Sequence, residues 1–419
     1  MGTLPTIILV AAAYIVLGAV SARFSIVQSE AWTVWLASGV TLGMLLERPR
    51  DSWAPVLIGA GAAAIVFALS FHTPVRDSVA YGVIEVVVAI AGATSAALIA
   101  PLPARFAATR DVGALVVGAF VLSLAGATLV GLWHALTSQP DAWLVFRVWL
   151  LGTTVGTLLV APLVTSWLQV QPKRPDGLPA LVGGAVACAL FLVCLGLLFA
   201  SPVVASLGGS IAEGLTYLPF VFFSVIGLLW GARGVAATAL AGALLSIYGT
   251  SKGMGPFADR EGFFGEANLE VQAYSAALAI TGLLVSTLAE GQRAAATRAR
   301  DWQTRFEATI GAHRLIAYEW DPAGGRFIAT GDTVGLVGVP AGHLVTLADW
   351  LACVAAPDRD AVAARFGERG QSGVEDTLRY AVSGPSGPTP VVDEARAILD
   401  REGALHRIVG IVRAARDGT

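Results

Sequence analysis

The chain has 419 residues, of which 55% are hydrophobic and only 14% charged, and its mean hydropathy is +0.70. About a quarter of the residues of a soluble protein are charged, so this composition indicates a chain that lies largely in lipid. The net charge of −3, with basic residues in short clusters, argues against a nucleic-acid-binding surface. Three cysteines, Cys188, Cys194 and Cys353, match no metal-ligand spacing and predict packing roles.

Nearly all of the apolar sequence precedes residue 290, and the roughly 130 residues that follow have an ordinary soluble composition. Crossing the hydrocarbon core of a bilayer takes roughly 20 apolar residues. Ten stretches meet this need, near residues 4–22, 32–47, 53–71, 78–100, 112–136, 143–168, 180–200, 215–232, 234–250 and 271–289. The sequence therefore predicts a polytopic α-helical membrane bundle of about ten spans with a small soluble domain after it.

The orientation of the chain follows from basic residues at alternate span ends. Arg48, Arg50, Arg233 and Arg293 all fall on one side if the N-terminus is cytoplasmic, and an excess of Lys and Arg marks cytoplasmic loops. With an even number of spans, both termini and the soluble domain are expected in the cytoplasm.

A few residues of the predicted spans are candidates for sensing a signal. Glu85 lies in the middle of a span, where a carboxylate is costly and is a functional hypothesis by default, with a polar tether between helices as the alternative. Arg147 is either a snorkelling residue or a partner of Glu85 or of an anionic ligand. Most tryptophans lie at span ends, as in an aromatic belt, but Trp149 is expected to line a cavity, and Trp35 joins the candidates.

Two blocks of sequence resemble the first class of MASE domain, a bacterial membrane-associated sensor, over about residues 5–290. The blocks contain Trp35–Gly39, Arg50–Pro55, Gly59, Glu85, Trp149–Gly152, Gly156 and Ala161–Leu163, then Trp230–Gly234, Gly249–Phe257, Gln272 and Tyr274. The segment Gly249–Phe257 is the most specific of these pieces. Three positions depart from the family pattern, at Leu36–Ala37, Val83 and Thr153. The resemblance implies a sensor in the bacterial inner membrane.

The soluble region resembles a PAS domain. Extended segments at 315–321 and from 326, a helix opening at Ala356–Arg359, and three more extended segments at 376–383, 391–400 and 405–413 carry the likeness. It implies a cytoplasmic α+β domain with a five-stranded antiparallel sheet and helices on one face. The expected domains are a MASE-type sensor at 1–290, a helical linker at 291–312 and a PAS-like domain at 313–419.

The linker has an apolar stripe with the spacing of a short heptad seam. Its members are Ala295, Ala299, Trp302, Phe306 and Ile310. A parallel homodimer helix that transmits a signal is one interpretation, and a solvated helix that caps its own PAS-like domain is the other.

The chain shows no cyclase, phosphodiesterase or kinase signature, so the sequence assigns it no catalytic residue, no metal site and no evident cofactor. The two resemblances imply an input protein of bacterial signal transduction, in the lipid bilayer, whose output is a histidine kinase of a two-component system or a cyclic-di-GMP enzyme. A small-molecule transporter or channel with a regulatory PAS-like domain is the alternative, because broken, Gly-rich spans also suit transporters. An interaction scaffold is a third hypothesis.

Overall fold

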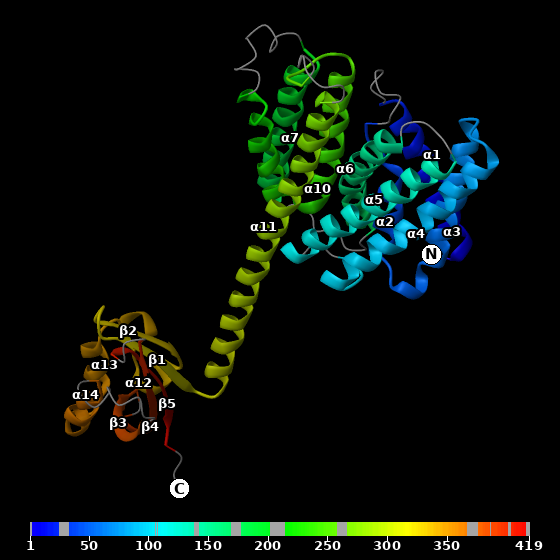
Figure 1. Ribbon diagram of the computed structural model, residues 1–419. Coiled ribbons are helices and arrows are strands. Elements are labelled where there is room, and N and C mark those ends of the chain that lie inside the picture. The colour runs from blue at the N-terminus through cyan, green and yellow to red at the C-terminus, as the bar shows by residue number, and fades with distance from the viewer. Residues whose placement is uncertain are drawn as a thin grey trace. The chain divides into compact units, whose positions relative to one another are not determined.

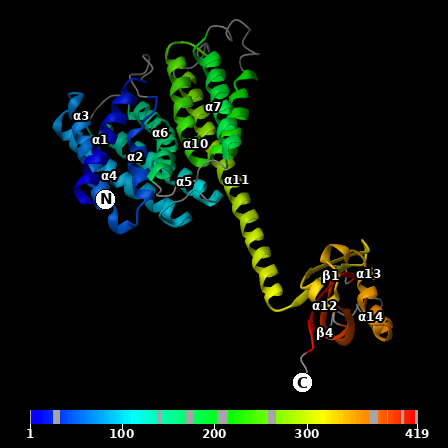
Figure 2. The same ribbon diagram turned by 180° about the vertical axis from the view of Figure 1, so that it is seen from behind.

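The structure is a computed structural model, and it describes residues 2–24, 33–104, 106, 108–137, 142–168, 177–201, 214–257, 266–366, 376–385, 387–400 and 404–415. The chain divides into two compact units, Met1–Ala294 and Ala295–Thr419. The first unit is helical and the second contains a sheet (Figures 1 and 2).

The helices of the first unit are α1 (Thr3–Ala22), α2 (Ala37–Leu46), α3 (Ala54–Ser70), α4 (Val75–Ile99), α5 (Thr109–Leu136), α6 (Ala142–Leu168), α7 (Gly177–Phe199), α10 (Leu218–Ser251) and α11 (Glu266–Ala312). Helix α2 packs against α1, α4 and α6, and all ten of its residues are buried. The first unit therefore has a short central helix enclosed by longer ones.

Glycines let the helices of the first unit approach closely. A Cβ atom added at Gly39 or at Gly43 of α2 would lie within 2.9 Å of a valine side chain on α6, and Gly92 of α4 faces Gly118 of α5 at a similar distance. Without a hydrophobic driving force between helices in lipid, small residues at the crossings allow the van der Waals contact that holds them together.

The prediction of ten spans was wrong, because seven helices of the described chain are long and apolar enough to cross a membrane. Helices α2 and α3, with 10 and 17 residues, are shorter. In the apolar stretch at 32–47 the residues Val34–Leu36 have no regular secondary structure, so only ten residues are helical and rise about 15 Å. The stretches at 215–232 and 234–250 both lie largely within the bounds of α10, but an interruption at Gly231 separates them.

Helix α10 is interrupted at Gly231, which has φ 66° and ψ −161°. A Cβ atom on Gly227 would lie 3.3 Å from Cγ2 of Val235, although eight residues of straight helix rise about 12 Å. The chain therefore folds back at Gly231, where glycine tolerates a positive φ, and the two parts of α10 lie side by side.

The second unit contains a five-stranded antiparallel sheet in the order β2-β1-β5-β4-β3. Its elements are β1 (Leu315–Asp321), β2 (Arg326–Gly331), α12 (Thr333–Val337), α13 (Leu347–Cys353), α14 (Arg359–Phe366), β3 (Asp376–Gly384), β4 (Gly387–Leu399) and β5 (Leu405–Ala414). Trp350 of α13 and Val362 and Phe366 of α14 share one hydrophobic core with the sheet. This PAS-like arrangement confirms the predicted fold class of the soluble part.

The basic-residue pattern leads to a topology prediction that fusions can test. Alkaline phosphatase, which needs disulfides formed outside the cytoplasm, is expected to be active when fused after Pro140 and inactive when fused after Pro175. The opposite pattern of activity in cells would reverse the assigned orientation of the termini.

Candidate functional site

Glu85 lies at the centre of a buried polar cluster in the first unit. It projects from α4, is 4% exposed, and accepts hydrogen bonds of 3.0 Å from the hydroxyls of Ser38 and Thr41 on α2. The Tyr14 side chain of α1 also hydrogen-bonds to this carboxyl group. Three helices that are separate in the sequence therefore meet at one carboxyl group, as expected of an intramembrane acid that faces the bundle interior.

The start of α2 is what brings Ser38 and Thr41 to Glu85. The non-helical segment Val34–Leu36 before the helix is held by a 2.9 Å hydrogen bond from the Trp35 N–H to the Gly152 carbonyl. A Cβ atom on Gly156 would lie 1.9 Å from the Trp35 carbonyl oxygen, so only glycine fits there. Ser38 and Thr41 are three residues apart and thus lie on one face of α2.

Trp35 forms part of the wall near this cluster. Its ring meets Tyr14 edge-on at 6.0 Å and Phe67 edge-on at 5.3 Å between ring centroids. Of the four candidate sensing residues, Trp35 and Glu85 are therefore connected, with Tyr14 between them.

The other two candidates, Trp149 and Arg147, lie elsewhere on α6. The ring centroids of Trp149 and Tyr81 are 6.1 Å apart. The Trp149 indole packs against Gly126, where an added Cβ atom would lie 2.8 Å from Nε1 of the indole. Arg147 is exposed and its guanidinium lies 5.9 Å from the Trp143 ring centroid. The suggested partnership of Arg147 with Glu85 is not seen in the described part of the chain, where Glu85 hydrogen-bonds to the hydroxyls of Ser38, Thr41 and Tyr14. The sensing roles of all four residues stay predictions.

A second polar group was missed by the sequence reasoning. The Tyr81 hydroxyl lies 3.0 Å from Nε2 of His134, and the Trp133 indole donates a 3.0 Å hydrogen bond to buried Asp77, which also pairs with Arg76. Asp77 and Tyr81 precede Glu85 on α4 by eight and four residues. A four-residue spacing places side chains on one helix face, so the sequence already indicated that Asp77, Tyr81 and Glu85 lie on the same side of the helix.

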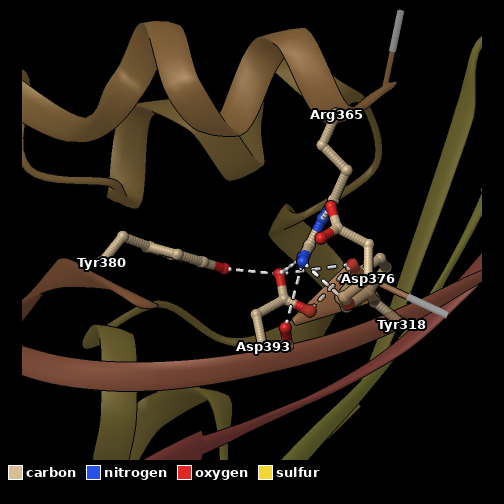
Figure 3. Close-up of polar contacts among 5 residues, drawn as sticks. All are labelled: Tyr318, Arg365, Asp376, Tyr380 and Asp393. Carbon is tan, nitrogen blue, oxygen red and sulfur yellow. Dashed lines mark hydrogen bonds and ion pairs between the residues drawn. The ribbon is translucent and has the colours of Figure 1, made fainter. Parts of the chain in front are cut away.

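The interior of the PAS-like domain contains a buried ion pair (Figure 3). Arg365 of α14 lies 2.8 Å from Oδ2 of Asp393 on β4, and the two side chains are 4% and 0% exposed. The hydroxyls of Tyr318 and Tyr380 donate to the same carboxylate at 3.0 and 2.9 Å. The guanidinium also reaches Asp376 at 3.2 Å. Both oxygen atoms of the Asp393 carboxylate therefore have polar partners within the domain.

Gly410 makes the Tyr318 contact possible. Tyr318 on β1 lies opposite Gly410 on β5, which in turn lies opposite Ala395 on β4. A Cβ atom on Gly410 would lie 2.5 Å from the tyrosine ring. The ring therefore lies flat across β5 and carries its hydroxyl to Asp393.

Aromatic rings occupy the rest of this interior. Tyr318 stacks with Phe327 and Trp350 at 5.3 and 5.9 Å, and Phe366 packs against both Tyr318 and Phe327. A cavity of about 690 Å³ lies instead against the other surface of the sheet, lined by residues that include Phe306, Ile328 and Ile411. No group of three or more metal-ligating side chains occurs in the described residues.

Burial raises the pKa of Tyr318 and of Tyr380 well above the usual tyrosine value, and the charge of Asp393 raises both further. Burial likewise raises the pKa of Asp393, although Arg365 opposes that rise. With their pKa values raised, the hydroxyls of Tyr318 and Tyr380 stay protonated at physiological pH. Both tyrosines are therefore neutral hydrogen-bond donors.

The tyrosine shifts predict alkaline destabilisation of the PAS-like domain. Residues 295–419 contain two tyrosines and no lysine. Each tyrosine pKa is higher in the folded than in the unfolded state, so the stability from both is complete below about pH 10 and falls above it, by up to about 2.7 kcal/mol per pH unit. Urea unfolding of residues 295–419 at several pH values measures this slope.

The control for that measurement is Tyr380→Phe, which should halve the slope. Because burial also raises the pKa of the Cys353 thiol, both proteins carry Cys353→Ser. A slope that is unchanged in Tyr380→Phe would show that Tyr380 releases its proton without unfolding.

Helix α11 runs without a break from Glu266 to Ala312 and ends three residues before β1. Ala295 and Ala299 are exposed, and Trp302 and Phe306 are 67% and 38% exposed and stack on each other at 5.1 Å. Four residues of the predicted stripe therefore lie on the helix surface, whereas the fifth, Ile310, is 4% exposed. The use of the stripe as a dimer seam stays a prediction.

The Gly249–Phe257 segment packs on the end of α7. A Cβ atom on Gly249 would lie 1.8 Å from the Phe199 carbonyl oxygen, and Gly255 has φ +89° against the same residue. Phe257 joins Phe199 and Tyr274 in an aromatic cluster with ring centroids 5.5 to 5.8 Å apart. The most specific motif of the sequence thus holds α7, α10 and α11 together.

Solved structures similar to the C-terminal region come from sensor proteins. One is the N-terminal domain of a diguanylate cyclase with a PAS/PAC sensor from Marinobacter aquaeolei, with 18% identity over 24% of this chain and 94% of that chain and a TM-score of 0.23. Another is a sensory box histidine kinase/response regulator from Burkholderia thailandensis E264, with 17% identity over 27% of this chain and 86% of that chain and a TM-score of 0.23.

A third similar structure is an RNA-binding light-oxygen-voltage receptor, with 18% identity over 25% of this chain and 31% of that chain and a TM-score of 0.23. No curated protein matches the chain. The family model of MASE1 matches residues 6–293. Because that match covers well over half of the chain and includes Glu85 and its partners, the chain belongs to the MASE1 family of membrane sensor domains.

Proposed function

We propose that the protein is a signal-sensing input protein of the bacterial inner membrane. Its MASE1 domain receives a signal at the Glu85 cluster, helix α11 passes it to the PAS-like domain, and a kinase or a cyclic-di-GMP enzyme acts downstream. The observation that carries the proposal is the continuous 47-residue helix α11, which begins in the membrane domain and ends directly before β1.

Contacts at the fold-back of α10 support a coupling role for α11. Arg293 of α11 donates a hydrogen bond to the carbonyl of Leu228, which precedes the interruption at Gly231 by three residues. The Glu290 carboxylate lies 2.9 Å from the Cβ position of Gly231. A movement of α10 therefore acts directly on α11 at Glu290 and Arg293, where the linker at 291–312 begins.

The exposed stripe supports a parallel homodimer. Trp302 and Phe306 present a large apolar surface on a helix whose other positions are charged, such as Arg300 and Arg305. A seam of about three turns is marginal by itself, so contacts between membrane domains must support it. Two copies with adjoining stripes would bury both aromatic pairs.

Disulfide crosslinking in membranes tests the dimer. Single cysteines at Ala299 and at Trp302 are expected to crosslink two subunits efficiently, whereas one at Arg300, which points to another side of the helix, should crosslink poorly. The protein for this test lacks its three native cysteines. Equal crosslinking at the three positions would remove the fixed seam and the transmission mechanism with it.

One observation favours transport as a second candidate function. Helix α2 is short, follows non-helical backbone inside the bundle and touches a buried carboxyl group, and substrate sites of transporters use such discontinuous helices. Uptake of radiolabelled metabolites by vesicles that contain the protein would favour this alternative. The sensor proposal predicts no uptake above that of empty vesicles.

A further inference from the structure

We propose that Glu85 is a reversible proton-binding site, so that the signal received by the membrane domain is the proton activity of the water at one face of the bilayer. The inference deepens the proposed function and rests on it, because it names the ligand of the same cluster. The geometry of the cluster, its surroundings and the polar residues that lead to it carry the argument.

The first argument concerns charge. Glu85 is buried, and the partners given for it in the described chain, Ser38, Thr41 and Tyr14, are neutral hydroxyl groups. A carboxylate inside a membrane costs at least about 2.5 kcal/mol unless a cation compensates it. The neutral acid is therefore an accessible state of this side chain, whereas a neighbouring arginine would have fixed the ionised state.

The second argument concerns the chemistry of the partners. A hydroxyl both donates and accepts hydrogen bonds, whereas a guanidinium or a backbone N–H only donates. The ionised carboxylate accepts from Ser38 and Thr41 at 3.0 Å, and the protonated acid donates to one hydroxyl while it accepts from the other. The cluster can thus satisfy both protonation states by rotating hydroxyl groups, with no movement of the backbone.

The third argument concerns the other titratable groups around Glu85. Tyr14 is the one such residue of α1, and α2 and α3 contain none. The remaining titratable residues of α4, α5 and α6 lie toward the helix ends or one turn away, and they are Arg76, Asp77, Tyr81, Arg110, Asp111, His134 and Arg147. A proton taken up in the cluster is therefore expected to reside on Glu85 itself.

The fourth argument concerns access from water. Asp77, Tyr81 and Glu85 occupy successive turns of α4, about 6 Å apart along the axis. Tyr81 meets His134 at 3.0 Å, and Asp77 meets the Trp133 indole. These polar groups lead from the beginning of α4 to the buried carboxyl. A proton from the water at that end converts the carboxylate to a carboxylic acid, and its release reverses the step.

Proton binding changes the contact between α4 and the central helix. With Glu85 ionised, both Ser38 and Thr41 donate to it, and with Glu85 protonated the hydroxyl of Ser38, Thr41 or Tyr14 accepts from it. The strength of the hydrogen bonds that hold α2 to α4 therefore changes, because bonds to a charged acceptor are roughly twice as strong as neutral ones. Helix α2 also packs on α6, which contacts α10.

Infrared spectroscopy of the full chain in lipid nanodiscs tests the proposal. The carbonyl stretch of a protonated carboxylic acid is distinct from the amide bands, and it is followed from about pH 4 to pH 9, a range that includes shifted buried carboxyls. We expect one such band to disappear as the pH rises and to be missing from Glu85→Gln. Identical pH-dependent spectra of the two proteins would overturn the proposal.

A milder variant keeps the test valid if Glu85→Gln does not fold. Ser38→Ala removes one donor to the ionised form, so the midpoint of the band should move by about one to two units to higher pH. A titration midpoint that is unchanged in Ser38→Ala would contradict proton binding at this cluster. A midpoint that shifts when the titration is repeated at another sodium concentration would contradict it too.

The outcome is separable from that of the proposed function. Crosslinking at Ala299 and Trp302 reports on the dimer helix and does not depend on which ligand Glu85 binds. A titrating band with no dimer seam would leave the proton site standing and remove the transmission mechanism. A dimer seam with no titrating band would remove the proton site and leave the transmission mechanism standing.

Discussion

Asp393→Ala is expected to destabilise the PAS-like domain by about 3–5 kcal/mol, because it leaves the Arg365 guanidinium buried without its counter-ion. Two tyrosine hydroxyls, from Tyr318 and Tyr380, lose their acceptor in the same variant. For a domain of this size the loss lowers the melting temperature by roughly 10–20 °C. Urea and thermal unfolding of residues 295–419, which form a compact unit with a core of their own, measure the change.

Asp376→Asn is the matched control, because Asp376 also pairs with Arg365 but is 60% exposed. Exposed pairs contribute about 1 kcal/mol or less, so this variant should unfold almost as the natural protein does. Replacing both members of the buried pair, as in Arg365→Met with Asp393→Leu, should recover much of the stability. Equal losses for Asp393→Ala and Asp376→Asn would show that the buried pair has no special role.

Gly156→Ala is expected to prevent correct folding of the membrane domain. The added Cβ atom would lie 1.9 Å from the carbonyl oxygen of Trp35, and both partners belong to backbone that cannot rotate away. Overpacking of this kind costs about 3 kcal/mol or more, which exceeds the gain of about 1 kcal/mol from alanine in a helix. The non-helical segment Val34–Leu36 before α2 would be displaced, and Ser38 with it.

Gly196→Ala on α7 is the control for that variant, since no atom lies within 4 Å of its added Cβ. Thermal aggregation of the purified protein in detergent should place Gly196→Ala at or above the natural protein and Gly156→Ala well below it. Similar curves for the two variants would show that the contact between α6 and the non-helical segment Val34–Leu36 is not tight.

Some of this architecture is visible in the sequence. The strand at 315–321 has the predicted bounds, since alternating apolar residues between a helix and a Gly-Gly turn leave few other choices. Strand β4 begins at Gly387, earlier than expected, because Pro388 and Pro390 pair with β3 at positions that lie beyond the end of β5. Proline is tolerated where a strand lacks one neighbour.

The burial of Glu85 also follows from the sequence, because an acid in an apolar stretch has few other places to go. Its partners do not follow, since Ser38 and Thr41 are 47 and 44 residues away and resemble any other small polar residues of a span. The span count fails for a related reason. Hydropathy does not distinguish a long helix from irregular chain that is buried by neighbouring helices, as at Val34–Leu36.

The ion pair of the PAS-like domain is only half visible. Asp393 alternates with Val391 and Ala395 on the core side of β4, so its burial can be deduced from a period of two. Arg365 belongs to a short helix whose docking on the sheet depends on tertiary packing. Gly410, which admits the Tyr318 ring, is indistinguishable by sequence from a glycine that only weakens a strand.

The central claim is that the state of the Glu85 cluster reaches the linker through α11. Its most direct test is disulfide crosslinking of a cysteine at Ala299 in membranes, compared between the natural Glu85 and Glu85→Gln, with Arg293→Ala in both backgrounds. We predict that Glu85→Gln changes the crosslinked fraction and that Arg293→Ala, which removes the contact with Leu228, abolishes the difference. Crosslinking that is the same for Glu85 and Glu85→Gln in folded protein would contradict the claim.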